Sequence, residues 1–120
     1  MIDAREQVKE LLLTVCDNVK MAKPDGDVEL PLICYTERSN LPVNIAYDRI
    51  QWRVAVYANT FEEVINLVNA VEEKMTGLGF TRTAVTPDDE SHIGTDLYLK
   101  RIDYSALINK EYNTVVKGSV

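Results

Sequence analysis

The residues of this chain that could do chemistry are few, and their spacing does not favour it. His92, the only histidine, follows the acidic run Asp88-Asp89-Glu90, and an imidazole among carboxylates is a set that can bind metal ions. A single histidine on a polar loop is more typical of a solvated acidic turn, and the run lacks the spacing of a calcium loop. We therefore predict no metal site.

General acid–base and nucleophilic chemistry are no better supported. Asp96 and Asp103 would need to be buried and opposed to act as paired carboxylates, but they flank the charged pair Lys100-Arg101, which indicates an exposed strand face. The segment Gly77-Leu78-Gly79 follows a helix pattern instead of opening one, unlike a phosphate loop. Three serines lack a nucleophile-elbow context: Ser39, Ser91 and Ser105. The sequence predicts no catalytic residue, no cofactor-binding residue and no cofactor, and so a protein that is not an enzyme.

The overall composition limits the class of protein. The 120 residues are 46% hydrophobic and 27% charged, which is typical of one globular domain and argues against disorder. The net charge of −6 disfavours a phosphate-neutralising surface, so we expect no sequence-specific nucleic-acid partner. The acidity favours solubility, or else provides a surface that must not adhere to DNA passing near it.

The cysteines and the N-terminal residues indicate a reducing compartment. Cys16 and Cys34 lie in apolar stretches, where free cysteines act as small core residues, and their context leaves a disulfide open without indicating one. The segment 1–6 is too acidic and polar for a signal peptide. No apolar run approaches the ~20 residues of a membrane span, so we expect a cytosolic protein with no membrane partner.

The elements that must position these residues begin with a helix. A first helix is expected from a cap at Asp3 to about residues 20–22, because apolar residues recur there at helical spacing. Residues 30–38 are then expected to form a strand. Pro42 argues against continuing that strand through the connection at residues 39–44.

The clearest unit is a strand followed directly by a helix. Residues 49–58 alternate in polarity, and their apolar face includes Trp52, so this face should meet the helices. Thr60 and Glu63 have the spacing of a capping box, which predicts the start of the helix. Gly77 and Gly79, which bracket Leu78, are expected to end it.

Two further strands are expected at residues 80–85 and 95–108, with a polar loop between them. The order is then helix, strand, strand, helix, strand, strand. It predicts an α+β fold with the order α-β-β-α-β-β, a four-stranded antiparallel sheet, and both helices packed on one face. Residues 1–108 would form one domain, and residues 109–120 a C-terminal tail without a regular period.

Two groups of residues are candidates for contact with a partner. The outer face of the strand at residues 49–58 carries one group, and the tail carries the other, because tyrosines and apolar side chains outside a core are common at interfaces. The tail either adds a strand to a neighbouring chain, frays, or folds onto its own domain. The candidate interface residues are Gln51, Arg53, Tyr57, Tyr112, Val115 and Val116.

The order and texture of these elements resemble those of the tail terminator, or tail completion, proteins of long-tailed (siphovirus-type) phages and prophages. The resemblance covers about residues 3–108 and includes an N-terminal helix, but it rests on no invariant signature, so no functional residue is carried over. The segments that resemble the family pattern are Leu30-Pro31-Leu32-Ile33-Cys34-Tyr35-Thr36-Glu37, Gln51-Trp52-Arg53-Val54-Ala55-Val56-Tyr57-Ala58, Thr60-Phe61-Glu62-Glu63 and Leu97-Tyr98-Leu99-Lys100-Arg101-Ile102-Asp103-Tyr104.

This resemblance implies a structural subunit. Members of the family form homo-oligomeric rings, commonly hexamers, that cap the finished tail tube and offer a surface to the head connector. The implied partners are copies of the same chain, the tail tube protein and the head completion or connector protein. The implied location is the virion tail, and the host cytoplasm during assembly.

Two other hypotheses remain open on the sequence. The first is a small ferredoxin-like adaptor or ligand-binding module, which would need an apolar pocket with convergent polar groups. The second is an enzyme that uses Asp96, Asp103 or His92, which would need these groups in one cleft with shifted pKa values.

Overall fold

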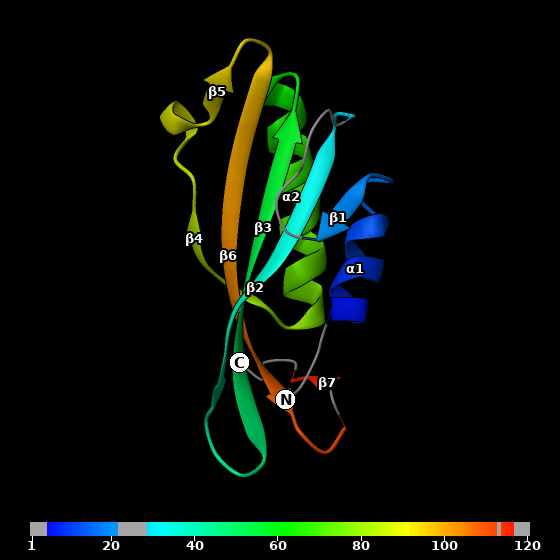
Figure 1. Ribbon diagram of the computed structural model, residues 1–120, viewed down its shortest axis with the longest axis vertical. Helices are drawn as coiled ribbons and strands as arrows, with labels where there is room; N and C mark the ends of the chain where they lie inside the picture. Colours follow the sequence, from blue (N-terminus) through cyan, green and yellow to red (C-terminus); the bar gives the residue numbers. More distant parts are fainter. Residues whose placement is uncertain (1–4, 22–28, 113, 117–120) are drawn as a thin grey trace.

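A mixed β-sheet with two helices on one face makes this protein an α+β fold (Figure 1). The computed structural model describes residues 5–21, 29–112 and 114–116. The helices are α1 (Arg5–Leu13) and α2 (Phe61–Leu78), and η1 (Asp88–Glu90) is a short 3-10 turn. The strands are β1 (Val19–Met21), β2 (Leu32–Pro42), β3 (Tyr47–Ala58), β4 (Thr81–Val85), β5 (His92–Gly94), β6 (Leu97–Asn109) and β7 (Thr114–Val115).

The longest strand, β6, has partners on both sides. β3 runs antiparallel along one side of it, and β5, β4 and β7 pair in succession with the other side. β2 pairs antiparallel with β3, and β1 pairs parallel with β2. The described part of the chain thus forms a seven-stranded mixed sheet, so the predicted four-stranded antiparallel sheet is corrected.

The first helix is shorter than its periodicity predicts. α1 ends at Leu13, and Thr14 turns the chain by donating its hydroxyl to the Leu11 carbonyl oxygen at 2.6 Å. Val19, expected on the helix, lies instead in β1 and pairs with Ile33. Consecutive β-branched residues lower helix propensity after Leu13, and the sheet edge then recruits the next segment. The predicted cap at Asp3 lies outside the described residues.

β2 also departs from the prediction, because it continues through Pro42 into a long hairpin with β3. β1 pairs only with residues 33–35, so the far half of β2 has no described strand on its other side. A proline is tolerated on such an edge, where its missing N–H breaks no ladder hydrogen bond. A bulge between Glu37 and Ser39 shifts the pairing register along the way.

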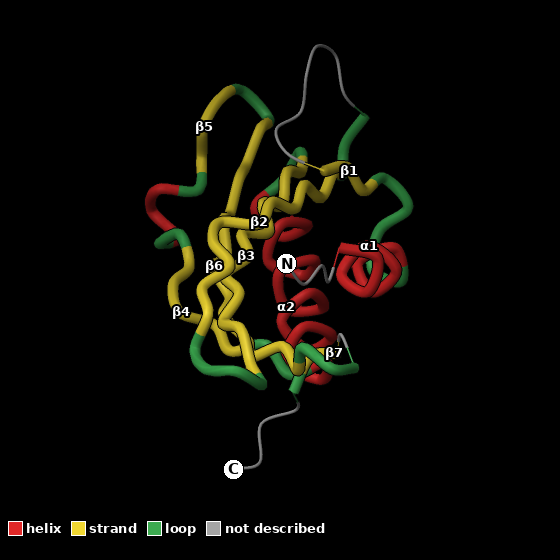
Figure 2. The backbone as a smooth tube through the Cα atoms, turned by 60° about the horizontal axis from the view of Figure 1, so that its bottom comes forward, coloured by secondary structure: helices red, strands yellow, loops and turns green. Residues whose placement is uncertain are grey.

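The core lies between the sheet and the helices (Figure 2). Alternate residues of β3 and β6 face α2, as the polarity pattern predicts, and Trp52 and Tyr104 are the largest fully buried side chains. The Tyr104 hydroxyl donates to the Glu72 carboxylate at 2.9 Å, and burial, followed by this hydrogen bond, raises the pKa of Tyr104 above its usual range.

Both ends of α2 follow local chemistry. The predicted cap is confirmed, since the Glu63 N–H donates to Thr60 Oγ1 at 3.1 Å. Of the two glycines predicted to end the helix, Gly77 lies within it, and the helix stops at Leu78, directly before Gly79. Gly79 has a φ of 115°, and its N–H donates to the carbonyl oxygens of Met75 and Thr76. Glycine adopts this left-handed conformation without a Cβ penalty, so Gly79 is the residue that ends the helix.

Candidate functional site

The residues considered for catalysis are spread over the molecule. His92, on β5, stacks beside Tyr98 with ring centroids 4.9 Å apart. Asp96 lies in the turn before β6 with a φ of 52°, and Asp103 pairs with Arg53. Within residues 5–21, 29–112 and 114–116, no three histidine, cysteine or acidic residues gather as metal ligands. His92 and Asp103 therefore have structural contacts, with Tyr98 and Arg53 respectively.

The acidic loop beside His92 is held by a buried cation. Lys100 is only 4% exposed although it is charged. Its ammonium donates to the Thr86 carbonyl oxygen at 2.9 Å and forms a close ion pair with Asp88. The buried Ser91 hydroxyl donates to the Pro87 carbonyl oxygen at 3.1 Å. Because a buried charge needs such partners, Asp88 has a structural role in closing this loop.

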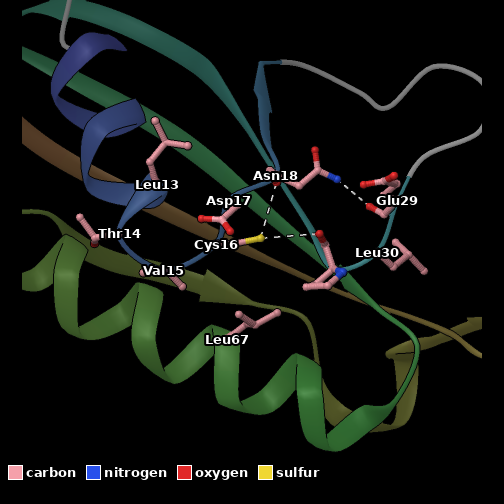
Figure 3. A pocket seen from close by; sticks show the side chains of 10 residues that line it. Leu13, Thr14, Val15, Cys16, Asp17, Asn18, Glu29, Leu30 and Leu67 are labelled. Carbon is pink, nitrogen blue, oxygen red and sulfur yellow. Dashed lines mark hydrogen bonds between the residues drawn. The ribbon is translucent and has the colours of Figure 1, made fainter.

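A groove of about 400 Å³ lies where α1 leads toward β1 (Figure 3). Residues 13–18, 29–31 and Leu67 line it. Two of its polar side chains contact its backbone: the Asn18 side-chain amide donates to the Glu29 carbonyl oxygen at 2.6 Å, and the Cys16 thiol approaches the Pro31 carbonyl oxygen at 3.6 Å. These contacts tie the turn after α1 to the entrance of β2 instead of converging on an open space.

The hairpin of β2 and β3 carries the most exposed apolar side chains. It extends past the end of α2, at the bottom of Figure 1, where no helix covers it. Ile45 is 95% exposed, Leu41 and Val43 are also exposed, and Tyr112 on the neighbouring turn is 68% exposed. We call these four residues the tip patch. Grouped apolar side chains in water are typical of a surface that contacts another protein.

Hydrogen bonds fix the shape of this tip. The Asn44 carboxamide oxygen accepts from the backbone N–H groups of Ala46 and Tyr47 at 2.8 and 3.0 Å, which closes the turn. The Lys110 ammonium donates to the Asn44 carbonyl oxygen at 3.0 Å and pairs with the buried Asp48 carboxylate at 3.3 Å. These contacts close the turn at Asn44 and connect it to Lys110, directly after the end of β6.

Replacing Lys110 by methionine should weaken this support. The Asp48 carboxylate would keep its buried position but lose its cation, which costs about 1–3 kcal/mol for a buried polar group left without its partner. Urea unfolding should show that loss, and amide exchange should be faster at residues 43–48 than in the wild type. Lys74→Met, at an exposed position in the C-terminal half of α2, is the matched control and should leave both unchanged. Equal effects of the two variants would contradict a bracing role for Lys110.

The uncovered face of the sheet carries a group of arginines. Arg49, Arg53 and Arg101 alternate along β3 and β6 with residues that pack under α2, so they point away from the helices. Arg53 forms a two-pronged ion pair with Asp103, at 2.8 and 3.2 Å. In the described part of the chain, neither Arg38 nor Arg101 has a carboxylate at ion-pair distance. This face therefore has more positive than negative charge.

Three of these arginines surround one hollow of about 180 Å³. Arg38, Arg53 and Arg101 line it together with Cys34, Thr36, Ala55 and Tyr57. Burial raises the pKa of Tyr57, and the positive charge of Arg101 acts in the opposite direction. The phenol thus stays a neutral hydrogen-bonding group beside fixed guanidinium charges, an arrangement suited to binding carboxylates.

The six predicted interface residues fall into three places. Gln51, Arg53 and Tyr57 lie on the uncovered face of β3, as predicted, and Tyr112 belongs to the tip patch. In the tail, Val115 is 9% exposed and packs in the chain's own core, and the Val116 N–H donates to the Leu107 carbonyl oxygen at 2.8 Å. We therefore leave these two valines out of the contact surfaces proposed below.

Sequence reasoning named Tyr112 but missed the three hairpin residues of the tip patch, and it missed that Arg38 and Arg101 lie beside Arg53. The apolar residues Leu41, Val43 and Ile45 alternate with other residues in the sequence, and this alternation was the available signal for the hairpin part of the tip patch. The position of the arginines depends on the registers of β2–β3 and β3–β6, which bring Arg38 and Arg101 to the same hollow as Arg53. These registers have no local sequence signature.

No protein-family model matches the chain, and no curated protein matches it. None of the described helices has the length and apolar character needed to cross a membrane.

Proposed function

We propose that this chain is a structural subunit of a phage-type tail, a tail terminator or tail completion protein. In this proposal, copies of the chain form a ring, a hexamer by the family resemblance, that caps the tail tube and joins it to the head connector. Its partners are then its own copies, the tube protein and the connector protein. The ring assembles in the host cytoplasm and stays in the virion tail.

The observation that carries the proposal is the tip patch. A rigid hairpin that holds Ile45, Val43 and Leu41 in water gains free energy only when another protein covers it, at about 25 cal/mol per Å² of apolar surface buried. A subunit that must dock onto a tube end needs such a projecting surface. The family resemblance supports the same function independently of the tip.

The groove beside Leu67 is the feature that the alternative ligand-binding hypothesis would use. Its Asn18 amide and Cys16 thiol already have partners within the groove, so these two groups are not free to fix a small ligand. We therefore favour assembly over ligand binding.

The test is assembly on purified tail tubes. The protein alone, and then mixed with tubes, would be examined by sedimentation velocity and negative-stain electron microscopy. We expect ring-shaped oligomers, alone or at tube ends, and tubes whose length stops increasing once capped. A protein that stays monomeric at all concentrations and leaves tube ends bare would overturn the proposal.

A further inference from the structure

The uncovered arginine face has a charge opposite to that of most of the protein. The whole chain carries a net charge of −6, yet the outward positions of β2, β3 and β6 hold four arginines and one acidic residue, Asp103. The Asp103 carboxylate is already held by Arg53. The guanidinium groups of Arg38 and Arg101, which form no ion pair within the described part of the chain, are therefore available to an acidic surface outside it.

An acidic surface lies on the opposite side of the same molecule. α2 holds four glutamates and one lysine, and these residues are Glu62, Glu63, Glu72, Glu73 and Lys74. Of the glutamates, Glu62 and Glu73 are exposed, while Glu72 accepts the Tyr104 hydrogen bond. Glu62, Asn66, Asn69 and Glu73 recur at helical spacing and form one exposed stripe, which we call the α2 stripe. Its two glutamates are ~16 Å apart along the axis, at 1.5 Å per residue.

We propose that the arginine face of one copy binds the α2 stripe of a second copy. The arginine face lies on one side of the sheet and α2 covers the other, so the two surfaces do not meet within one molecule (Figure 2). Because they are different surfaces, the contact is heterologous: each copy keeps one surface free for the next. Repetition of such a contact gives a closed ring or an open filament.

Charge complementarity identifies the α2 stripe of a second copy as the surface that binds the arginine face. Arginine forks bind carboxylates with two parallel hydrogen bonds, and the hollow between Arg38, Arg53 and Arg101 has room for one or two carboxylate groups. Opposed patches also steer association and exclude the wrong orientation, because like charges facing each other are costly. The inference deepens the proposed function, since it names the contact between subunits in the ring.

The test exchanges charges between the two surfaces. R38E/R101E reverses the arginine face, and E62K/E73K reverses the α2 stripe, in both cases at exposed side chains. Each variant should self-associate at least about a hundredfold more weakly than the wild type, because like charges then face each other. The chain carrying all four changes should associate again, and so should an equal mixture of the two variants. Sedimentation velocity at low and high salt measures these affinities, and high salt should weaken the wild-type contact.

The outcomes separate this inference from the proposed function. If R38E/R101E still forms the rings that the wild type forms, the arginine-face contact is wrong, and the proposed ring stands. If both variants lose self-association and neither the four-change chain nor the mixture recovers it, the arginine-face contact is also wrong. D89K/E90K tests the other acidic segment. If these changes, and not the α2 changes, restore self-association to R38E/R101E, the α2 stripe is excluded. A wild type that neither associates nor caps tubes would overturn the proposed function itself.

Discussion

The variant V43D/I45D should lose binding to tail tubes by at least about thirtyfold, because truncating a dominant interface residue costs about 2 kcal/mol or more. Both side chains are exposed at the hairpin tip. An aspartate there would have to leave water to enter the contact, which adds a desolvation penalty. The measurement is the amount of protein that co-sediments with purified tubes over a concentration series.

Stability should hardly change in this variant, since surface substitutions away from packed contacts stay within about 0.5 kcal/mol. The turn itself is closed by Asn44 and braced by Lys110, and neither is altered. I93D is the matched control, because Ile93 is also an exposed isoleucine but lies on β5. Tube binding that survives V43D/I45D, or that falls equally in I93D, would mean that the tip patch is not the docking surface.

The second large effect is expected in the core, where Trp52→Ala should cost about 3–5 kcal/mol of unfolding free energy. Trp52 is 1% exposed and stacks on Tyr35 with ring centroids 5.8 Å apart. A domain of this kind has only about 5–15 kcal/mol of stability in total. The alanine variant should therefore be close to unfolded at physiological temperature.

Trp52→Phe separates ring packing from the indole N–H. The indole Nε1 has no hydrogen-bond partner among the described residues, so phenylalanine removes a costly orphaned donor while it loses part of the ring. We expect it to cost about 1–2 kcal/mol, well below the alanine variant. Urea unfolding of both variants, with the slope checked for constancy, gives the comparison. Near-equal losses would show that the ring does not fill the core as described.

The strand–helix unit was predictable because its information is local. Alternation over residues 49–58 and the Thr60–Glu63 spacing predict β3 and the start of α2, and the structure confirms both. The end of α1 was not predictable in this way. Its apolar period continues to Val19, but pairing with Ile33 draws that residue into the sheet. Long-range pairing overrides local periodicity when a sheet edge competes with a short helix.

The candidate surfaces depend even more on pairing. The outward direction of Arg53 follows from alternation within one strand, and this was predicted. The approach of Arg38 and Arg101 to it requires the β2–β3 and β3–β6 registers, which connect residues far apart in the sequence. Pro42 misled the prediction of the hairpin, because a proline rules out a central strand but not an edge.

The place of β6 in the sheet has a consequence for synthesis on the ribosome. β3 needs β6 as its neighbour, and the two strands are joined by a long segment that includes α2 and β4. Until residues 97–109 have left the exit tunnel, one side of β3 has no backbone partner, although its apolar face has already been made. At ~5–20 residues per second, the nascent chain spends seconds in this open state. During this time the unpaired edge of β3 is exposed to pairing with other chains.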